Sequence, residues 1–363
     1  MTTFDKASAS GRGPSRFFSW TRSHRMVCIL CGILAALLTV FVLWRLPGQT
    51  AQAGGKDYIK FATLAPEGSS WMKQMHNLEK EVKQATGGEL GFKFYPGGVS
   101  GDEKDVIRKM RIGQLHAAGF TGVGLGEILP EVRVLDLPFL FRNDREIAHV
   151  YDKMTGYFSK AFEAKGFVLL GWVPVGWIHF FSVKEIRSVE DLRQTKAWMW
   201  EGDPLVQTAY DVLGVTPHPL SVTDVLMALQ TGMVETVYSS PMGALALQWY
   251  TKVNYMSQVR MGNSTGAVLM TRRKFRKLSA RHQEILRRAS KKYLSMLVRQ
   301  IRSDNQRAIE VMQKNGLKLA APPSAQELEQ FHKLGAVIRK RLSGRLFPSS
   351  LLKQVMAHLQ ELR

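Results

Sequence analysis

Residues 220–241 read LSVTDVLMALQTGMVETVYSSP, a pattern that predicts a helix, a strand and the start of another helix. Residues 221–224 supply the hydroxyl and carboxylate groups that cap a helix, and Gly232 is suited to end it. Val234–Tyr238 is a short apolar run typical of a buried strand. Pro241 fits the first turn of the next helix. Helices and strands that alternate at this spacing indicate an α/β fold.

The same alternation extends from this stretch back to Gly54. Short apolar runs predict strands at Tyr58–Thr63, Leu90–Tyr95, Ala117–Thr121, Phe167–Val173, Trp177–Val183 and Lys196–Trp200. Amphipathic runs predict helices at Ser69–Thr86, Gly101–Ile112, Ile147–Lys165 and Pro204–Leu213. Gly and Pro residues separate these segments, as turns between short elements require.

Toward the C-terminus, two strand-like runs, Asn254–Met261 and Ala267–Met270, precede a strongly basic segment, Arg272–Arg302. Apolar residues recur in the basic segment at helical spacing, at Leu278, Ile285, Leu286, Tyr293, Leu294 and Leu297. This periodicity predicts a long amphipathic helix with a solvated basic face, which we favour over a nucleic-acid site. A final helical region is expected at Ser324–Leu362.

The order of these elements predicts two α/β lobes connected by a hinge. We expect the chain to leave the first lobe near residue 175 and to return near residue 265. The expected domains are lobe 1 at 54–176, completed by about 266–320, then lobe 2 at 177–265 and a C-terminal helical region at 321–363. In such folds a ligand lies in the cleft, at the carboxyl ends of the strands.

The first 53 residues have the features of a targeting segment. Basic residues dominate the first 26 positions, and 18 uncharged residues follow from Val27 to Trp44. Ala51-Gln52-Ala53 is a sequence that a signal peptidase accepts, which favours a cleaved signal peptide. A retained anchor is the alternative, because about 20 apolar residues span a bilayer. Either way the rest of the chain is exported, and we expect it in the periplasm, either free after cleavage or tethered to the inner membrane.

The composition excludes several classes of protein. The chain has 363 residues, 45% of them hydrophobic, so it is long enough for one large domain or two ordinary ones. Its only cysteines, Cys28 and Cys31, lie in the uncharged N-terminal run, which excludes a disulfide scaffold or a cysteine-ligated metal in the exported part. The net charge is +20, from 50 Lys and Arg against 30 Asp and Glu.

Three motifs are weak candidates for chemistry. Residues 262–266 match the G-x-S-x-G pattern of serine hydrolases, but the residues after Ser264 predict a strand where that motif needs a helix. Gly122, Gly124 and Gly126 lack the spacing of a nucleotide-binding loop and are expected to form a tight loop after a strand. The histidines are scattered without the spacing of metal ligands. A Na⁺ or Ca²⁺ site that uses Glu201 and Asp203 remains an alternative.

Tryptophans are concentrated in the predicted second lobe and next to it. Trp172, Trp177, Trp198, Trp200 and Trp249 fall within one fifth of the chain. Trp198 and Trp200 share one face of a strand, because side chains alternate along a strand. Such rings either pack in the core or stack on an apolar ligand, and for each ring taken alone core packing is the better prediction.

Several segments together resemble the DctP family, the extracytoplasmic solute receptors of TRAP transporters. Residues 228–235 (ALQTGMVE) and 246–250 (ALQWY) carry the main resemblance. Residues 95–98 (YPGG), 135–141 (LDLPFLF) and 188–193 (SVEDLR) match in the same order and spacing. The basic helix that follows looks like the hinge-spanning helix of the family.

The resemblance implies a two-lobed periplasmic binding protein fold with a hinge-spanning long helix. It further implies a receptor that captures a small solute and delivers it to the small and large permease subunits of a TRAP transporter. We expect no catalysis, no cofactor, no tightly bound metal and no nucleic-acid partner. The alternatives are a binding protein of another transporter or of a sensor, and an exported serine hydrolase.

The sequence departs from the family at the positions that usually hold an organic acid. Residues 191–198 read DLRQTKAW, and the resemblance implies that Trp198 stands where most members have the carboxylate-binding arginine. Ser240 stands where an asparagine is usual. Loss of a desolvated charge partner costs a bound carboxylate about 2–5 kcal/mol. We therefore expect a more apolar or aromatic ligand, or an acid held elsewhere, for example through a cation near Glu201.

The candidate ligand-binding residues come from both predicted lobes and from the hinge. Trp198 and Ser240 are carried over by motif position, and Trp177 and Ile178 begin the strand that matches the hinge. The other candidates lie at loop or strand ends that should face the cleft: Glu67, Trp71, Phe120, Thr121, Glu201 and Tyr238.

Overall fold

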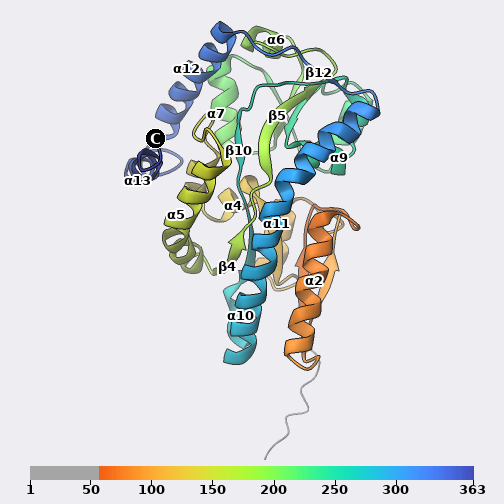
Figure 1. Cartoon of the computed structure of the whole chain (residues 1–363), viewed down its shortest axis with the longest axis vertical. Coiled ribbons are helices and arrows are strands. Elements are labelled where there is room, and N and C mark those ends of the chain that lie inside the picture. The colour runs from red at the N-terminus through yellow and green to blue at the C-terminus, as the bar shows by residue number, and fades with distance from the viewer. Residues whose placement is uncertain (1–56) are drawn as a thin grey trace, which may run out of the picture. The chain divides into compact units, whose positions relative to one another are not determined.

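The computed structural model describes residues 57–363 (Figure 1), so the predicted signal peptide or anchor at 1–53 lies outside the described residues. The first of two sheets has the strand order β2-β1-β3-β11-β4. Its strands are β1 (Asp57–Ala62), β2 (Leu90–Tyr95), β3 (Ala117–Thr121), β4 (Phe167–Trp172) and β11 (Gly266–Thr271). β1 is parallel to β2 and β3, whereas β11 is antiparallel to β3 and β4.

The second sheet has the order β12-β9-β5-β8-β6-β7, with β10 beside β5. Its strands are β5 (Gly176–Ser182), β6 (Ala197–Trp200), β7 (Pro217–Leu220), β8 (Thr236–Ser239), β9 (Tyr255–Met256), β10 (Gly262–Ser264) and β12 (Lys318–Leu319). The predicted strand at 254–261 is therefore mostly irregular. An α/β fold with two sheets is confirmed.

Amphipathic helices cover the first sheet because each presents one apolar stripe to it. They are α2 (Ser70–Ala85), α3 (Glu103–Arg111), α4 (Gly122–Ile128) and α5 (Asp144–Ala164), with a 3₁₀ segment η1 (Pro130–Asp136). α2 is representative: the Ser69 hydroxyl accepts a hydrogen bond from Met72 N at its start. Its buried residues, Trp71, Met72, Met75, Leu78 and Val82, recur at helical spacing.

Shorter helices surround the second sheet. They are α6 (Val189–Arg193), α7 (Pro204–Leu213), α8 (Val225–Gln230) and α9 (Pro241–Ala246), with the 3₁₀ segment η2 (Trp249–Lys252). Proline opens both α7 and α9, as expected where a missing N–H costs nothing. The stretch at 220–241 therefore folds into the predicted helix, strand and start of a helix. The predicted cap at residues 221–224 is wrong, because no side chain there accepts a hydrogen bond from the first turn of α8.

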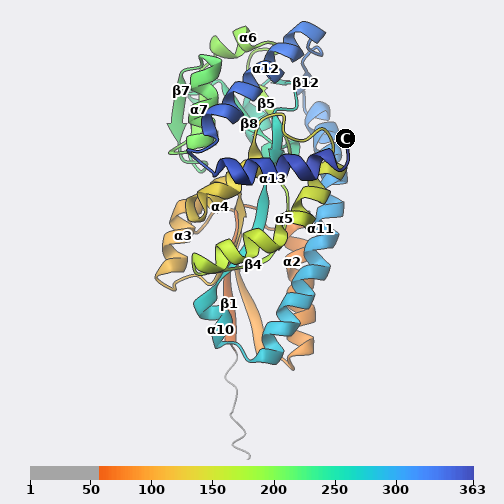
Figure 2. The same cartoon turned by 90° about the vertical axis from the view of Figure 1, so that its left-hand side faces the viewer.

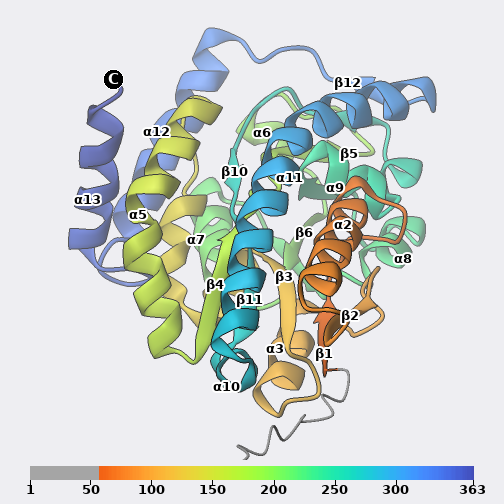
Figure 3. The same cartoon turned by 60° about the horizontal axis from the view of Figure 1, so that its bottom comes forward.

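The basic segment forms two helices, α10 (Arg272–Lys277) and α11 (Ala280–Lys314), rather than the one predicted. The break occurs at Leu278-Ser279, where the Ser279 hydroxyl accepts from His282 N and caps α11. α11 packs on α2 and β4 of the first sheet and on α9 and β5 of the second (Figures 2 and 3). The hinge-spanning long helix is thus confirmed, and it runs twelve residues beyond the predicted Arg302.

The predicted C-terminal region forms two helices that pack on different parts of the molecule. α12 (Ala325–Leu342) contacts α6 and α7, whereas α13 (Ser349–Gln360) contacts α5. β12, which we expected to lie in lobe 1, pairs with β9 of the second sheet. Within residues 57–363 no helix is long and apolar enough to cross a membrane.

Two of the passages of the chain between the sheets lie side by side. The chain leaves the first sheet between β4 and β5 and returns between β10 and β11. Val173 N donates to Gly266 O, and Val175 N donates to Ser264 O, so the two crossings are hydrogen-bonded to each other. A Cβ on Gly266 would overlap Val173 O, which explains why glycine is required at this close approach.

Candidate functional site

A cavity of about 280 Å³ lies between the two sheets. The first sheet contributes residues that follow or end its parallel strands, including Thr63 after β1 and Phe120 and Thr121 in β3. The second sheet contributes Trp200, which ends β6, and Ser239, which ends β8. The carboxyl ends of parallel strands from both sheets therefore meet at one site, the usual position of a ligand in open α/β folds.

Aromatic side chains form much of the wall that the second sheet supplies. The Trp198 ring is stacked on Tyr238, with centroids 4.8 Å apart, and it meets the edge of Trp249 at 5.2 Å. Trp198 Nε1 donates to Leu220 O at 3.1 Å, so its only donor is already used. Trp198 is 1% exposed. It borders the cavity as part of a packed aromatic cluster that fixes the shape of the wall.

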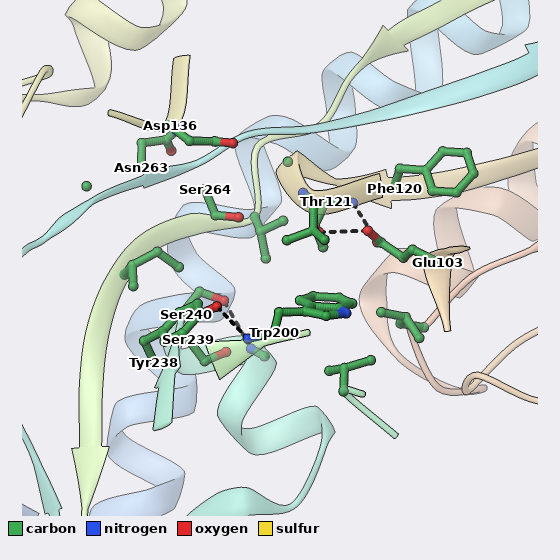
Figure 4. Close-up of a pocket in the computed structure, with 18 of the residues that line it drawn as sticks. Glu103, Phe120, Thr121, Asp136, Trp200, Tyr238, Ser239, Ser240, Asn263 and Ser264 are labelled. Atoms are coloured by element: carbon green, nitrogen blue, oxygen red, sulfur yellow. Dashed lines mark hydrogen bonds between the residues drawn. The ribbon is translucent and has the colours of Figure 1, made fainter. Parts of the chain in front are cut away.

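Serine and threonine supply the polar atoms of the wall. Ser240 is buried and caps α9, since its hydroxyl accepts from Gly243 N at 3.1 Å. Ser239 and Ser264 also line the cavity (Figure 4), and neither hydroxyl has a hydrogen-bond partner among residues 57–363. These two hydroxyls are therefore available to hydrogen-bond a ligand.

One arginine and two aspartates form a buried ion cluster at the cavity wall. Arg133 of η1 donates from Nη1 and Nη2 to the two carboxylate oxygens of Asp203, each at 3.0 Å. Arg133 Nε lies 2.7 Å from Asp136 Oδ2, an ion pair without the alignment of a hydrogen bond. Burial lowers the pKa of Arg133, but the two carboxylates more than offset this effect and raise it, so the guanidinium stays charged.

The ion cluster joins the two lobes. Arg133 lies beside the first sheet, whereas Asp203 caps α7 beside the second, accepting from Leu205 N at 3.0 Å. A second set of contacts joins the lobes nearby: Asp102 Oδ2 accepts from Trp200 Nε1 and from the Ser221 hydroxyl, both at 2.9 Å. Asp102 Oδ1 meanwhile caps α3 through Lys104 N. The two lobes are therefore in direct contact through side chains on both sides of the cavity.

Glu103 is a buried carboxyl group at the opposite wall (Figure 4). Its oxygens accept from Thr121 N at 2.7 Å, from the Thr121 hydroxyl at 2.9 Å and from Gly124 N at 2.7 Å. These donors stabilise the ionised form, yet burial has the larger effect and raises the pKa of Glu103 to about 7.

The three glycines of the G-x-G-x-G motif lie in α4, so the prediction of a tight loop is wrong. A Cβ on Gly122 would overlap Asp136 Oδ2, and one on Gly124 would lie 2.6 Å from Glu103 Oε2. A Cβ on Gly126 would lie 2.8 Å from Arg133 Cδ. Each glycine therefore makes room for one charged side chain of the cavity wall.

Seven of the ten candidate residues lie at the cavity wall: Trp71, Phe120, Thr121, Ile178, Trp198, Tyr238 and Ser240. The other three, Glu67, Trp177 and Glu201, lie away from it. Trp177 and Ile178 are adjacent in β5, so their side chains point to opposite sides. Trp177 Nε1 donates to Asp144 Oδ1 at 3.0 Å, on the side away from the cavity.

Glu67 and Glu201 both lie in exposed turns next to cavity residues. Glu67 Oε1 lies 2.9 Å from His76 Nε2, and 59% of its side chain is exposed. The Glu201 side chain is exposed, and only its carbonyl takes part in an interlobe contact, with Lys104 Nζ at 2.6 Å. A cation site that uses Glu201 and Asp203 is not supported, because Asp203 is engaged by Arg133. Residues 57–363 contain no group of three acidic, histidine or cysteine side chains that could hold a metal ion.

Sequence reasoning missed the charged part of the wall. Glu103, Arg133 and Asp136 were not among the candidates, and Asp203 was considered only as a possible cation ligand. Arg133 and Asp203 are 70 positions apart, and no local pattern connects them. The glycines at 122, 124 and 126 were the sequence signal that could have indicated these residues. Small residues at alternate positions permit the close approach of other side chains.

Ser264 is the last residue of β10, and the next strand, β11, begins two residues later at Gly266. A nucleophilic serine in a G-x-S-x-G motif needs a strand, a sharp turn and a helix in that order. The local structure therefore does not match the hydrolase motif.

The comparison with protein families gives one match across most of the chain. Residues 61–347 match the profile described as DctP, bacterial extracellular solute-binding protein, family 7. A solute-binding protein of Chromohalobacter salexigens is 24% identical over 220 residues, which cover 60% of this chain and 65% of the relative.

Solved structures share the fold at low sequence identity. A TRAP periplasmic solute-binding protein of Pseudomonas putida with bound D-glucuronate superimposes with a TM-score of 0.77 at 22% identity, over 83% of this chain and 97% of that one. The sugar acid binding protein of Advenella mimigardefordensis in complex with galactonate gives a TM-score of 0.80 at 19% identity, over 85% and 99% of the two chains. At these identities the likeness establishes the fold.

Proposed function

Because the chain belongs to bacterial extracellular solute-binding protein family 7, we propose that it is the solute receptor of a TRAP-type transporter. It captures a small organic solute outside the cytoplasm and delivers it to the small and large permease subunits in the membrane. The exported part acts in the periplasm, either released after cleavage of the first 53 residues or tethered by Val27–Trp44.

The observation that carries this proposal is the cavity between the two sheets. Its walls come from both lobes, so a bound molecule would contact both at once. A ligand that touches both lobes favours the closed arrangement over an open one, since it gains its full contacts only after closure. α11 and the two strand crossings form the hinge about which such closure occurs.

The ligand is more apolar or aromatic than a sugar acid. Trp198 occupies the position that the resemblance assigns to a carboxylate-binding arginine, and it is embedded in an aromatic cluster with Tyr238 and Trp249. Such a wall offers dispersion and stacking contacts. Hydrogen bonds to the ligand come from hydroxyl groups such as those of Ser239 and Ser264.

The structure at Ser264 favours a solute receptor over a serine hydrolase. Ser264 ends β10 and is followed by another strand, β11, where a hydrolase with this motif needs a helix. A receptor requires ligand binding and closure without turnover.

Native mass spectrometry of the exported protein tests the proposal. The protein is purified without added ligand and then denatured, and any released small molecule is identified. We expect one small organic compound in a one-to-one complex, and its addition back should raise the midpoint of thermal unfolding. A protein that neither carries nor is stabilised by any small molecule would contradict the receptor function.

Two tryptophan variants then test which wall the ligand contacts. Trp198→Ala should weaken affinity for the released compound at least tenfold, about 1.4 kcal/mol, because it removes part of the aromatic wall. Trp177→Ala is the matched control, since that ring lies outside the cavity, and its affinity should be unchanged. Circular dichroism verifies that both variants fold. Equal affinities in the two variants would show that Trp198 only packs the core.

A further inference from the structure

The single cationic side chain at the cavity wall is already neutralised by the protein. Within the described residues, the charged side chains at this wall are Glu103, Arg133, Asp136 and Asp203. Both terminal nitrogens of Arg133 are bonded to Asp203, and its Nε faces Asp136. One guanidinium is thus paired with two carboxyl groups before any ligand enters.

All three members of the ion cluster are buried. The side chains of Arg133, Asp136 and Asp203 are 6%, 8% and 1% exposed. Charges that are withheld from water interact strongly, so the cluster is held together firmly and its net charge matters at the site. Asp136 is fixed further by Thr265 N, which donates to its Oδ1 at 2.6 Å.

A ligand carboxylate would therefore meet an acidic site. It would have to displace Asp203 from the guanidinium or remain without a cation in a buried cavity, and both alternatives are costly. Glu103 is a further acidic group at the opposite wall, held by backbone and hydroxyl donors. Burial raises its pKa to about 7, so it is partly protonated near neutral pH and the repulsion comes mainly from the ion cluster. An uncharged molecule avoids this repulsion.

We propose that Asp203 occupies the carboxylate-binding face of Arg133 permanently, and that this receptor selects an uncharged organic ligand. The inference rests on the proposed receptor function and specifies its ligand class. The Arg133–Asp203 pair joins the lobes, so the protein itself supplies the ionic contact across the cleft. The ligand then contributes apolar surface and neutral hydrogen-bonding groups.

Asp203→Asn tests the inference because it removes the charge and keeps the helix cap. Asparagine is as good an N-cap residue as aspartate, so α7 should start normally. Asp136→Asn is the matched control: it removes a charge from the same guanidinium but leaves the bidentate Arg133–Asp203 pair intact. Thermal unfolding of both variants verifies that each is folded.

The probes are matched pairs of aromatic and alicyclic carboxylates and their primary amides, such as benzoate and benzamide. Binding to the exported protein is measured by thermal shift and titration calorimetry. We expect the native protein to bind members of the amide series and not their carboxylates. Asp203→Asn should gain at least about tenfold in affinity for carboxylates relative to the native protein, whereas Asp136→Asn should gain clearly less, because Asp203 still occupies both terminal nitrogens of Arg133.

The possible failures are distinct. Binding of a carboxylate by the native protein, or release of one on denaturation, would overturn the inference and leave the receptor function standing. Failure of Asp203→Asn to gain carboxylate affinity while the native protein binds amides would overturn the assigned role of Asp203. A native protein that binds none of the probes and carries no small molecule would contradict the receptor function itself.

Discussion

On the outer faces of α10 and α11, arginine and lysine side chains extend into solvent, whereas the charged side chains at the cavity wall are buried against one another. The exposed basic residues include Arg273, Arg276, Lys277, Arg281, Arg287, Arg288 and Lys291. At the cavity wall, Arg133 is enclosed by two aspartates. The two regions contain the same types of side chain in opposite environments.

The difference separates the charge of the molecule from the charge of its binding site. Within residues 57–363 the basic side chains named above are exposed, and water and salt screen such charges over about 10 Å. The cavity wall has an excess of carboxylates in spite of the net charge of +20. A strongly basic protein can therefore select against an anionic ligand, because burial and pairing determine the local charge.

Replacement of the buried arginine should have the largest effect. Arg133→Met leaves Asp136 and Asp203 buried without a cation, so the free energy of unfolding should fall by about 3–5 kcal/mol. Urea denaturation measures the loss. The triple variant that also carries Asp136→Asn and Asp203→Asn should recover part of it. A loss below about 1 kcal/mol in Arg133→Met would mean that the ion cluster contributes as little as surface charges do.

The stability of the protein should depend on pH through the buried Glu103 carboxyl group. The unfolded chain loses the Glu103 proton near its ordinary pKa of 4.5, whereas burial raises the pKa in the folded protein to about 7. Between these values the folded protein keeps a proton that the unfolded chain has released, so stability falls as the pH rises. The full effect is about 3 kcal/mol.

Glu103→Gln should remove this part of the pH dependence. The measurement is the difference in free energy of unfolding between the native protein and the variant from pH 4 to pH 8. His179, whose pKa burial lowers to about 4, contributes with the opposite sign in both proteins and cancels in the difference. A constant difference across the range would contradict the raised pKa of Glu103.

Gly122→Ala should have an intermediate effect. The added Cβ would overlap Asp136 Oδ2 and push that carboxylate away from Arg133, at a cost of about 1–3 kcal/mol. Gly156→Ala is the control, because Gly156 lies exposed in α5 with nothing within 4 Å of its added Cβ. The control should be stabilised slightly, by about 0.5–1 kcal/mol. If Gly122→Ala were stabilised as the control is, a glycine at position 122 would not be needed for the ion cluster.

Replacement of exposed charges should have the smallest effect. Arg276→Gln and Arg281→Gln remove charges that water screens, so we expect no measurable change in the denaturation midpoint or in ligand affinity. Titration calorimetry at low and high salt measures the ligand affinity. A clear loss of ligand affinity in these variants would mean that the basic face acts on the site from a distance.

Local sequence patterns predicted most elements of the fold. The strand at Leu90–Tyr95, the strand at Ala117–Thr121 and the helix at Pro204–Leu213 have the predicted bounds. These elements depend on hydrophobic periodicity, on capping residues and on the placement of proline, all of which are properties of the local sequence. The break between α10 and α11 was missed, because the apolar periodicity continues across Leu278.

The candidate site was predicted only in part. The ends of β3 and β8 were expected at the cleft, and residues there line the cavity. Trp177 and Ile178 could not be separated in advance, since the period of two gives opposite faces but does not say which face meets the cavity. The pairing of Arg133 with Asp203 was not predictable, because it depends on how one lobe closes over the other.

Residue patterns along the chain were therefore enough to predict the α/β class, most of the strands and helices, and the family to which the chain belongs. These follow from local propensity, from hydrophobic period and from motifs with fixed spacing. The charge of the cavity and the roles of the three glycines in α4 became evident only in the folded chain. Those properties arise where segments far apart in the chain exclude water together, and burial then sets which charges are paired.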